Sequence, residues 1–381
     1  VADHGLRPES GAEAAGVATL LARRGIAARV LRLDLEGRTA GVQARARAAR
    51  LAALLAECRV AGTPWLLLGH HLADQAETLL HRAAAGSGPT GLAAMAPVRA
   101  TPEALILRPL LGIAPARLEA VLAAAGVAPV RDPGNADPRF ARVRLRAALA
   151  DAAGTGPQTH ALASAATAFG ARRVRQARVM AERLAAAAVL HSEGWAELDP
   201  AELGRDAVAE AALAALIRVV GGAPRYAPAP AAVAALRVAG QGTLGGAWLR
   251  PGRAGRWLLL REPAGAAAAP AVPVRPGAVW DGRFRLTVPG AAAPDCAFTI
   301  GALGGAAAAL LRREPGAAPR ARHLPAAVLA TLPAIRPCHE ASRGHSALAA
   351  VPALLYPDPS AAARFAMVLA PVTGPVSGSG A

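Results

Sequence analysis

Short apolar runs alternate with longer stretches of helical spacing over the first 150 residues. Residues 30–35 are mostly apolar and predict a short strand, and another strand is expected to end near Asp3. Residues 65–69 (WLLLG) form one continuous apolar run, which predicts a strand buried on both faces. Helical spacing predicts three helices, over residues 10–24, 42–59 and 72–85. This order predicts an α/β fold, in which a parallel sheet carries helices on both faces.

Capping and turn-forming residues set the predicted helix ends. Ser10 is a favourable N-cap residue for the first helix, and Gly25 is expected to stop that helix. Gly86 ends the third helix in the same way, and a further helix is expected over residues 115–126.

The C-terminal half is predicted to contain separate regions, because its composition changes along the chain. Residues 224–230 and 264–276 are rich in Pro and Ala and predict linkers. The tail after Pro371 is expected to be disordered. The predicted regions are a catalytic domain over residues 1–150, a helical region over 151–223, a linker with a β-like segment over 224–276, and a small β or α+β domain over 277–381.

Composition and charge favour a polyanionic partner. All 42 basic residues are arginine, and the net charge is +16. Such an excess favours binding to phosphates, whose neutralisation releases counterions, although GC-rich coding would also enrich a chain in arginine. No apolar run reaches the roughly 18 residues of a membrane span, and no signal peptide is evident, so a cytosolic location without a membrane partner is expected. The chain opens without Met, which suggests a fragment or a misplaced start.

The cysteines do not predict a disulfide framework or a zinc site. Cys58, Cys296 and Cys338 are far apart and have no CxxC spacing. Three adjacent residues such as Cys338, His339 and Glu340 do not easily converge on one ion, and metal ligands stay unassigned.

Two carboxylates lie where a parallel sheet binds its ligands. Ligands sit at the carboxyl ends of such strands, where His4 and the pair His70 and His71 are expected. Asp74 and Glu77 are three residues apart on the following helix, so they share one face. This pair is suited to an ammonium group or Mg²⁺, whereas an acid favoured by the helix dipole explains either residue alone.

Four segments follow one another in a characteristic order. They are DHGLRPES (3–10), GHHLADQAETLL (69–80), GSGPTGLAAM (86–95), and RPLLGI (108–113) with DPGNADPRFARVRLR (132–146). Together they resemble the tRNA(Ile)-lysidine synthase family within the N-type ATP pyrophosphatases, the PP-loop group. Two later segments, over residues 240–250 (GQGTLGGAWLR) and 279–286 (VWDGRFRL), resemble the family's C-terminal extension more weakly.

The resemblance implies a Rossmann-like catalytic domain and a two-step ligation. ATP adenylates the C2 oxygen of the wobble cytidine in an isoleucine tRNA with a CAU anticodon, and pyrophosphate leaves. The ε-amine of free L-lysine then attacks C2 and displaces AMP, which changes codon recognition from AUG to AUA. Mg²⁺ is the expected cofactor beside ATP, and a homodimer is left open.

The same resemblance assigns roles to individual residues. Asp74 and Glu77 would recognise lysine, and Arg142 would take its carboxylate as a bidentate pair. His4 and His71, with Asp74, are the catalytic candidates.

Phosphate contacts are expected on both sides of this pocket. Asp3 and Arg7 are candidates for the ATP phosphates. Arg139, Arg144 and Arg146 are candidates for the tRNA backbone, and a solvated basic strip is the alternative for these three. The segment around Gly86 is better explained as a helix stop and tight turn than as a phosphate cradle.

The sequence departs from the family pattern at the nucleotide side. The family's SGGxDS loop, expected upstream of Asp3, does not occur among the 381 residues, so tight ATP binding is expected to fail in the chain as given. Ala73, Ala85 and Val143 stand where the family often has Asp, Arg and Asn. A truncated gene model of an active enzyme and an inactive paralogue are the two explanations.

Two other functions are left open. One is a non-catalytic tRNA-binding protein that has lost the ATP loop. The other is a different PP-loop enzyme of tRNA modification, such as a thiolase, which needs paired cysteines that Cys58 alone does not supply.

Overall fold

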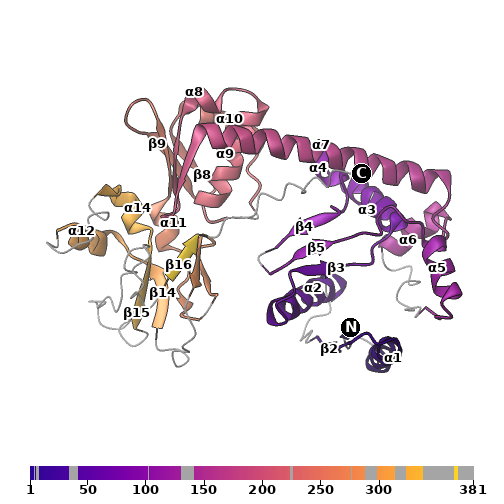
Figure 1. The fold of residues 1–381 in the computed structure, drawn as a ribbon. Helices are drawn as coiled ribbons and strands as arrows, with labels where there is room; N and C mark the ends of the chain where they lie inside the picture. Colours follow the sequence, from indigo (N-terminus) through magenta and orange to yellow (C-terminus); the bar gives the residue numbers. More distant parts are fainter. Residues whose placement is uncertain are drawn as a thin grey trace. The chain divides into compact units, whose positions relative to one another are not determined.

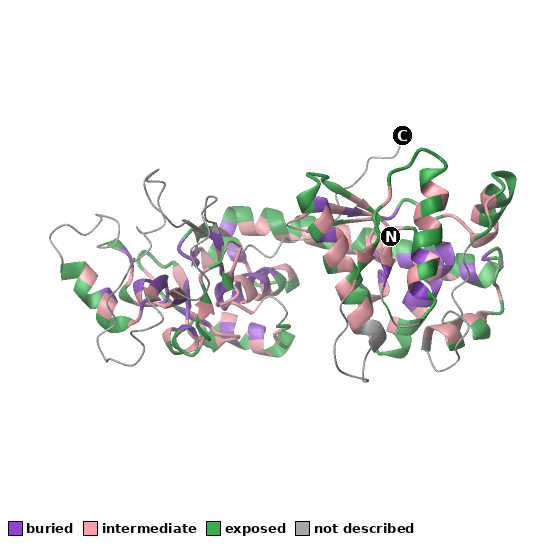
Figure 2. Ribbon diagram, turned by 90° about the horizontal axis from the view of Figure 1, so that it is seen from below, coloured by how far each residue is buried: buried purple, intermediate pink, exposed green. Residues whose placement is uncertain are grey.

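The computed structural model forms two compact units, of which one contains residues 1–175 and the other residues 176–372 (Figure 1). In each unit, buried positions gather inside and exposed ones cover the outer surfaces (Figure 2). The predicted boundaries at residues 150, 223 and 276 stay predictions. The structure describes residues 1–3, 5, 8–33, 42–101, 103–129, 141–223, 226–275, 277–287, 298–313, 323–337 and 364–367.

Parallel strand pairs form the sheets of the first unit. Strand β1 (Ala2–Asp3) pairs in parallel with β2 (Leu31–Arg32). Strand β3 (Trp65–Leu67) pairs in parallel with β5 (Leu105–Leu107), whose other edge takes the antiparallel strand β4 (Val98–Ala100). The parallel pairs confirm the predicted α/β fold, and β4 is an addition that the sequence did not predict.

The helices of this unit follow the predicted pattern closely. Glycines with positive φ come just after α1, α3 and α5, at Gly25 (72°), Gly86 (68°) and Gly126 (63°). These residues end the helices, as predicted for Gly25 and Gly86, because a left-handed backbone costs glycine little. The helices are α1 (Ser10–Ala22), α2 (Val42–Val60), α3 (Leu72–Ala84), α4 (Pro89–Leu92), α5 (Pro115–Ala124), α6 (Ala141–Leu149) and α7 (Pro157–Ala187), the last of which continues into the second unit.

The prediction that the WLLLG strand is buried on both faces is wrong. Trp65 is 51% exposed and Leu67 is 63% exposed, whereas Leu66 packs against a cluster that contains Leu55 and Ile106. Since alternate residues of a strand point to opposite faces, α2 covers only the Leu66 face.

The second unit begins with a five-stranded antiparallel sheet in the order β6-β7-β10-β9-β8. Helix α9 packs Leu213 and Ile217 against Leu249 and Leu259 of this sheet. No described helix of the chain is long and apolar enough to cross a membrane. The elements are β6 (Ala188–His191), β7 (Trp195–Leu198), α8 (Pro200–Leu203), α9 (Ala207–Val220), α10 (Pro230–Ala239), β8 (Gly242–Leu244), β9 (Ala247–Pro251) and β10 (Trp257–Arg261).

The region predicted to be helical over residues 151–223 contains a hairpin, so that prediction is wrong over residues 188–198. The ring of His191 stacks on Trp195 at 3.9 Å, and the second strand of the hairpin pairs with β10. These non-local contacts override the helical propensity of the Ala-rich sequence.

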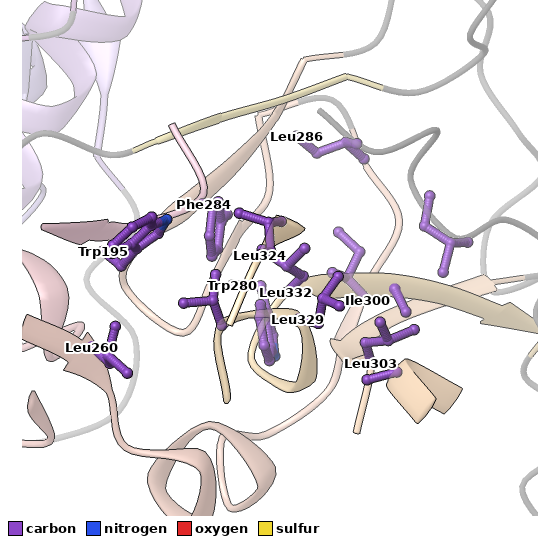
Figure 3. Packing of buried hydrophobic residues seen from close by; sticks show 14 residues of the cluster. Trp195, Leu260, Trp280, Phe284, Leu286, Ile300, Leu303, Leu324, Leu329 and Leu332 are labelled. Atoms are coloured by element: carbon purple, nitrogen blue, oxygen red, sulfur yellow. The ribbon is translucent and has the colours of Figure 1, made fainter. Parts of the chain in front are cut away.

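Two small sheets, in the orders β11-β14-β15 and β12-β13-β16, complete the second unit. Their core joins Trp280, Phe284 and Ile300 to Trp195 and Leu260 of the larger sheet (Figure 3). This agrees with the expected β or α+β C-terminal part. The elements are α11 (Pro263–Ala267), β11 (Val272–Pro273), β12 (Val279–Trp280), β13 (Phe284–Thr287), β14 (Phe298–Ala302), α12 (Gly305–Arg313), α14 (Ala326–Ala330), β15 (Pro333–Pro337) and β16 (Arg364–Met367).

The second expected linker, residues 264–276, contains most of α11 and all of β11. Burial explains this difference, because Ala266 is fully buried and Val272 packs against the core. The tail after Pro371 lies outside the residues that the structure describes.

Candidate active site

Helix α3 begins five residues after β3 ends, at the carboxyl end of a parallel strand. Asp74 lies in its first turn and is 16% exposed. Its Oδ2 atom accepts the backbone N–H of His71 at 2.9 Å and lies 3.5 Å from Nδ1 of the same residue. The carboxylate therefore closes the start of α3, which is the capping role that a helix dipole favours.

Glu77 lies one turn further along α3 and is 1% exposed. Its Oε1 accepts a hydrogen bond from Nε of Arg146 at 2.6 Å, and its Oε2 accepts one from Nη2 at 3.2 Å. The hydrogen bond to Glu77 raises the pKa of Arg146, although partial burial opposes this effect. Both residues are thus used in a bidentate ion pair between α3 and α6, and their predicted roles toward lysine and tRNA stay predictions.

Arg142 lies one turn before Arg146 on α6. Its Nη2 atom donates to Oγ1 of Thr78 at 3.3 Å, which brings the guanidinium to the helix that carries Asp74. A guanidinium has five N–H groups, so Arg142 keeps donors for a carboxylate. The structure therefore brings Arg142 to α3 one turn along from Asp74, and the predicted role of both residues toward lysine stays a prediction.

The structure describes some of the remaining predicted site residues and not others. Asp3 is buried, and its Oδ1 accepts hydrogen bonds from the Gly5 backbone N–H at 3.0 Å and from Oγ of Ser10 at 2.6 Å. Ser10 is the first residue of α1 and donates to Asp3, so its predicted N-cap role is wrong; Glu9 occupies that position. Arg144 is exposed on α6. His4, Arg7 and Arg139 lie outside the described residues.

His70 was not singled out as a catalytic candidate, yet its environment is unusual. Burial lowers its pKa to about 4, and the charges of Arg108, Arg47 and Arg50 act in the same direction, whereas Asp74 opposes them. Its Nδ1 atom is buried and has no hydrogen-bond partner within the described part of the chain. The imidazole is therefore neutral at pH 7.

Three polar side chains hold the segment that follows α3. Gln75 pairs with the backbone of Met95 through two hydrogen bonds of 2.9 Å. Arg82 donates to the carbonyls of Gly91 and Ala94, at 2.7 and 2.8 Å. Arg108 is buried and donates to the Ala96 carbonyl at 2.8 Å. The GSGPTGLAAM motif is thus a tightly anchored turn, and sequence reasoning did not identify the residues that anchor it.

No group of three or more His, Cys, Asp or Glu side chains that could hold a metal ion occurs among the described residues. Cys58 is buried as a free thiol beneath β3, and its Sγ atom lies 3.8 Å from the Trp65 carbonyl oxygen. Asp74 is the partly exposed carboxylate of this site, and its hard oxygens are ligands of the kind that Mg²⁺ prefers.

Comparisons with known proteins agree with this geometry. The family model of the PP-loop domain matches residues 1–153. A tRNA(Ile)-lysidine synthase of Methylobacterium sp. is 46% identical over 211 residues, which are 55% of this chain and 60% of that protein. One of Novosphingobium aromaticivorans is 41% identical over 268 residues, 68% of this chain and 79% of that protein. One of Ruegeria pomeroyi is 36% identical over 301 residues, 75% of this chain and 68% of that protein. The chain therefore belongs to the tRNA(Ile)-lysidine synthase family.

Proposed function

We propose that the protein ligates lysine to the wobble cytidine of an isoleucine tRNA with a CAU anticodon, at the expense of ATP, in the cytoplasm. The observation that carries this proposal is that His70 and Asp74 lie at the start of α3, while Arg142 of α6 reaches Thr78 one turn further along the same helix, in a domain of the PP-loop type. An acid suits the ammonium group of an amino-acid substrate, a guanidinium suits its carboxylate, and a neutral imidazole suits proton transfer.

The lysine pocket uses charges of both signs. Asp74 binds the α-ammonium group of lysine, and the free N–H donors of Arg142 take its carboxylate. Glu77 is committed to Arg146, so this pair holds α6 against α3 and thereby positions Arg142. This refines the predicted pocket, because Glu77 acts through α6 in addition to its negative charge near lysine.

The chemistry proceeds in two balanced steps. The C2 oxygen of cytidine attacks the α-phosphate of ATP, and pyrophosphate leaves. The neutral ε-amine of lysine then attacks C2, the C2–O bond breaks, and AMP leaves as one amine proton is released. His70 or His71 accepts that proton, and for His70 the lowered pKa keeps the imidazole unprotonated at neutral pH.

ATP and Mg²⁺ are the proposed cofactors of this reaction. Asp3 and Arg7 are the proposed contacts to the nucleotide, and Mg²⁺ would supply charge neutralisation of the triphosphate when it is bound. The 381 residues contain no SGGxDS segment. The test therefore compares this chain with a version extended by the in-frame sequence upstream of Val1.

The experiment measures incorporation of radiolabelled lysine into an isoleucine tRNA transcript with a CAU anticodon, together with AMP release. Release of one AMP for each lysine incorporated, by either version of the chain, supports the proposal. A methionine tRNA with the same anticodon is the matched control substrate. If both versions bind the isoleucine tRNA but transfer no lysine, the proposal is wrong and the chain is a non-catalytic tRNA-binding protein.

A further inference from the structure

Two backbone hydrogen bonds join the segment that follows β3 to the end of β5 and the segment beyond it. The N–H groups of Leu68 and Leu72 donate to the carbonyls of Leu107 and Ile113, at 2.8 and 3.0 Å. The strands themselves are parallel neighbours, so both segments leave the same edge of the sheet. His70 lies midway between the two donors, and its backbone therefore runs beside the segment that follows β5.

Arg108 is the first residue of that neighbouring segment and is 8% exposed. Its backbone N–H donates to the Pro97 carbonyl and its Nη1 to the Ala96 carbonyl, both at 2.8 Å, so the side chain is fixed inside the protein. Its Nε atom is buried without a hydrogen-bond partner, and Arg108 makes no ion pair with a carboxylate among the residues that the structure describes. A buried cation without a counter-charge destabilises a fold, and ionisable groups in such surroundings are concentrated at functional sites.

The charges around His70 come from three elements. Burial lowers the pKa of His70, Asp74 on α3 opposes this effect, and Arg108 after β5 acts with Arg47 and Arg50 on α2 to lower the pKa further. Arg108 is the buried member of these three cations, whereas the two on α2 are exposed and are screened by solvent ions. The charge of Arg108 therefore acts on the imidazole with the least screening.

We propose that Arg108 is a positioning residue of the site, because its buried charge at the end of β5 keeps the neighbouring His70 in the neutral form. The proton that this imidazole takes from the ε-amine of lysine rests on the proposed function, whereas the effect of Arg108 on His70 does not. The Nδ1 atom of His70 is buried and has no hydrogen-bond partner in the described part of the chain. The RPLLGI motif thus carries the charge that sets the protonation state of a histidine in the GHHLADQAETLL motif.

The test measures the pKa of His70 directly, by NMR titration of protein that contains isotope-labelled histidine. His70→Gln assigns the resonance. Arg108→Gln and Arg108→Met remove the charge with side chains of similar length, and Arg108→Lys keeps the charge. Arg99→Gln is the matched control, because it removes the same charge from an exposed position of the neighbouring strand β4. Circular dichroism and thermal melting check that each variant is folded.

The two neutral variants are expected to raise the pKa of His70 by about 0.5–1 pH unit, since they remove a positive charge that disfavours protonation. Arg108→Lys and Arg99→Gln are expected to stay within about 0.3 pH unit of wild type. An unchanged His70 titration in a folded neutral variant would overturn the proposal. An equal rise in Arg99→Gln would also overturn it, because the effect would then come from net charge and not from the place of Arg108.

The pH dependence of lysine ligation by the same proteins separates this inference from the proposed function. A base with a higher pKa is protonated at higher pH, so the acid limb of kcat/KM should move upward in the neutral variants and return in Arg108→Lys. An acid limb that stays in place although the pKa of His70 rises would overturn the positioning role. A raised pKa in a protein that transfers no lysine would support the action of Arg108 on His70 and contradict the proposed function alone.

Discussion

The Nε atom of Arg146 lies 2.6 Å from Oε1 of Glu77, so a bidentate ion pair with a buried carboxylate joins α6 to α3. Arg142 projects from α6 one turn earlier and reaches Thr78. The pair therefore fixes the helix that carries the proposed carboxylate-binding residue against the helix that carries Asp74.

Replacing Arg146 with Ala is expected to leave Glu77 as a buried carboxylate without a partner. The local free energy of opening of α3 and α6 should fall by about 2 kcal/mol, below the usual cost of breaking a buried pair because the Arg146 side chain is 42% exposed. Hydrogen–deuterium exchange of peptides from these helices measures this change. Arg59→Ala is the control, and the double variant Glu77→Leu with Arg146→Leu is expected to recover part of the protection. Unchanged exchange in Arg146→Ala would show that the pair contributes little.

The lowered pKa of His70 predicts a pH dependence of stability. Because the folded-state pKa is about 4 and the unfolded value is near 6.5, the unfolded chain binds the proton first as the pH falls. Stability that is present above pH 6.5 is therefore lost between pH 6.5 and pH 4. After a discount for partial exposure, wild type should lose about 1 kcal/mol more than His70→Gln between pH 7 and pH 5. Hydrogen–deuterium exchange of α3 peptides at both pH values, corrected for intrinsic exchange rates, measures this difference in stability. An equal loss of protection in wild type and His70→Gln would contradict the prediction.

A second buried ion network stabilises the C-terminal unit. Asp281 accepts hydrogen bonds from Arg261 at 2.7 and 3.0 Å and from Arg283 at 2.7 Å, and burial lowers the pKa of Arg283 to about 10. Asp281→Ala would leave two buried guanidinium groups without a counter-charge, at a cost of about 3–5 kcal/mol.

Urea unfolding followed by tryptophan fluorescence tests this prediction, because the tryptophans other than Trp65 all lie within residues 176–372. The control is Glu182→Ala, which breaks an exposed ion pair with Arg178 on α7 and should cost less than about 1 kcal/mol. Equal unfolding midpoints for the two variants would contradict the role assigned to Asp281.

The sequence predicted the local elements of the first unit well, since those elements depend on nearby residues. Gly25 and Gly86 ended two helices as expected. The hairpin over residues 188–198 was missed because its stability comes from pairing with β10, about 60 residues away in sequence.

The sequence motifs predicted which segments form the candidate site, but not which side chains of the site pair with one another. Nothing in the sequence connects Glu77 with Arg146, which lies 69 residues later, and the arginine-rich composition offers many alternative partners. The sequence also did not predict that Arg108 is buried and Arg82 partly buried, because arginine is usually exposed and both side chains donate to backbone carbonyls of a turn.

The most direct test of the lysine pocket is the KM for lysine in the tRNA ligation assay, with wild type compared with Asp74→Asn and Arg142→Gln in the version of the chain that transfers lysine. Each variant should raise this KM by about tenfold or more, since each removes a charged hydrogen bond to the substrate, while the KM for ATP changes less than threefold. Thr78→Val is the matched control, because it removes only the neutral partner of Arg142. An unchanged KM for lysine in both charge variants would contradict the proposed pocket.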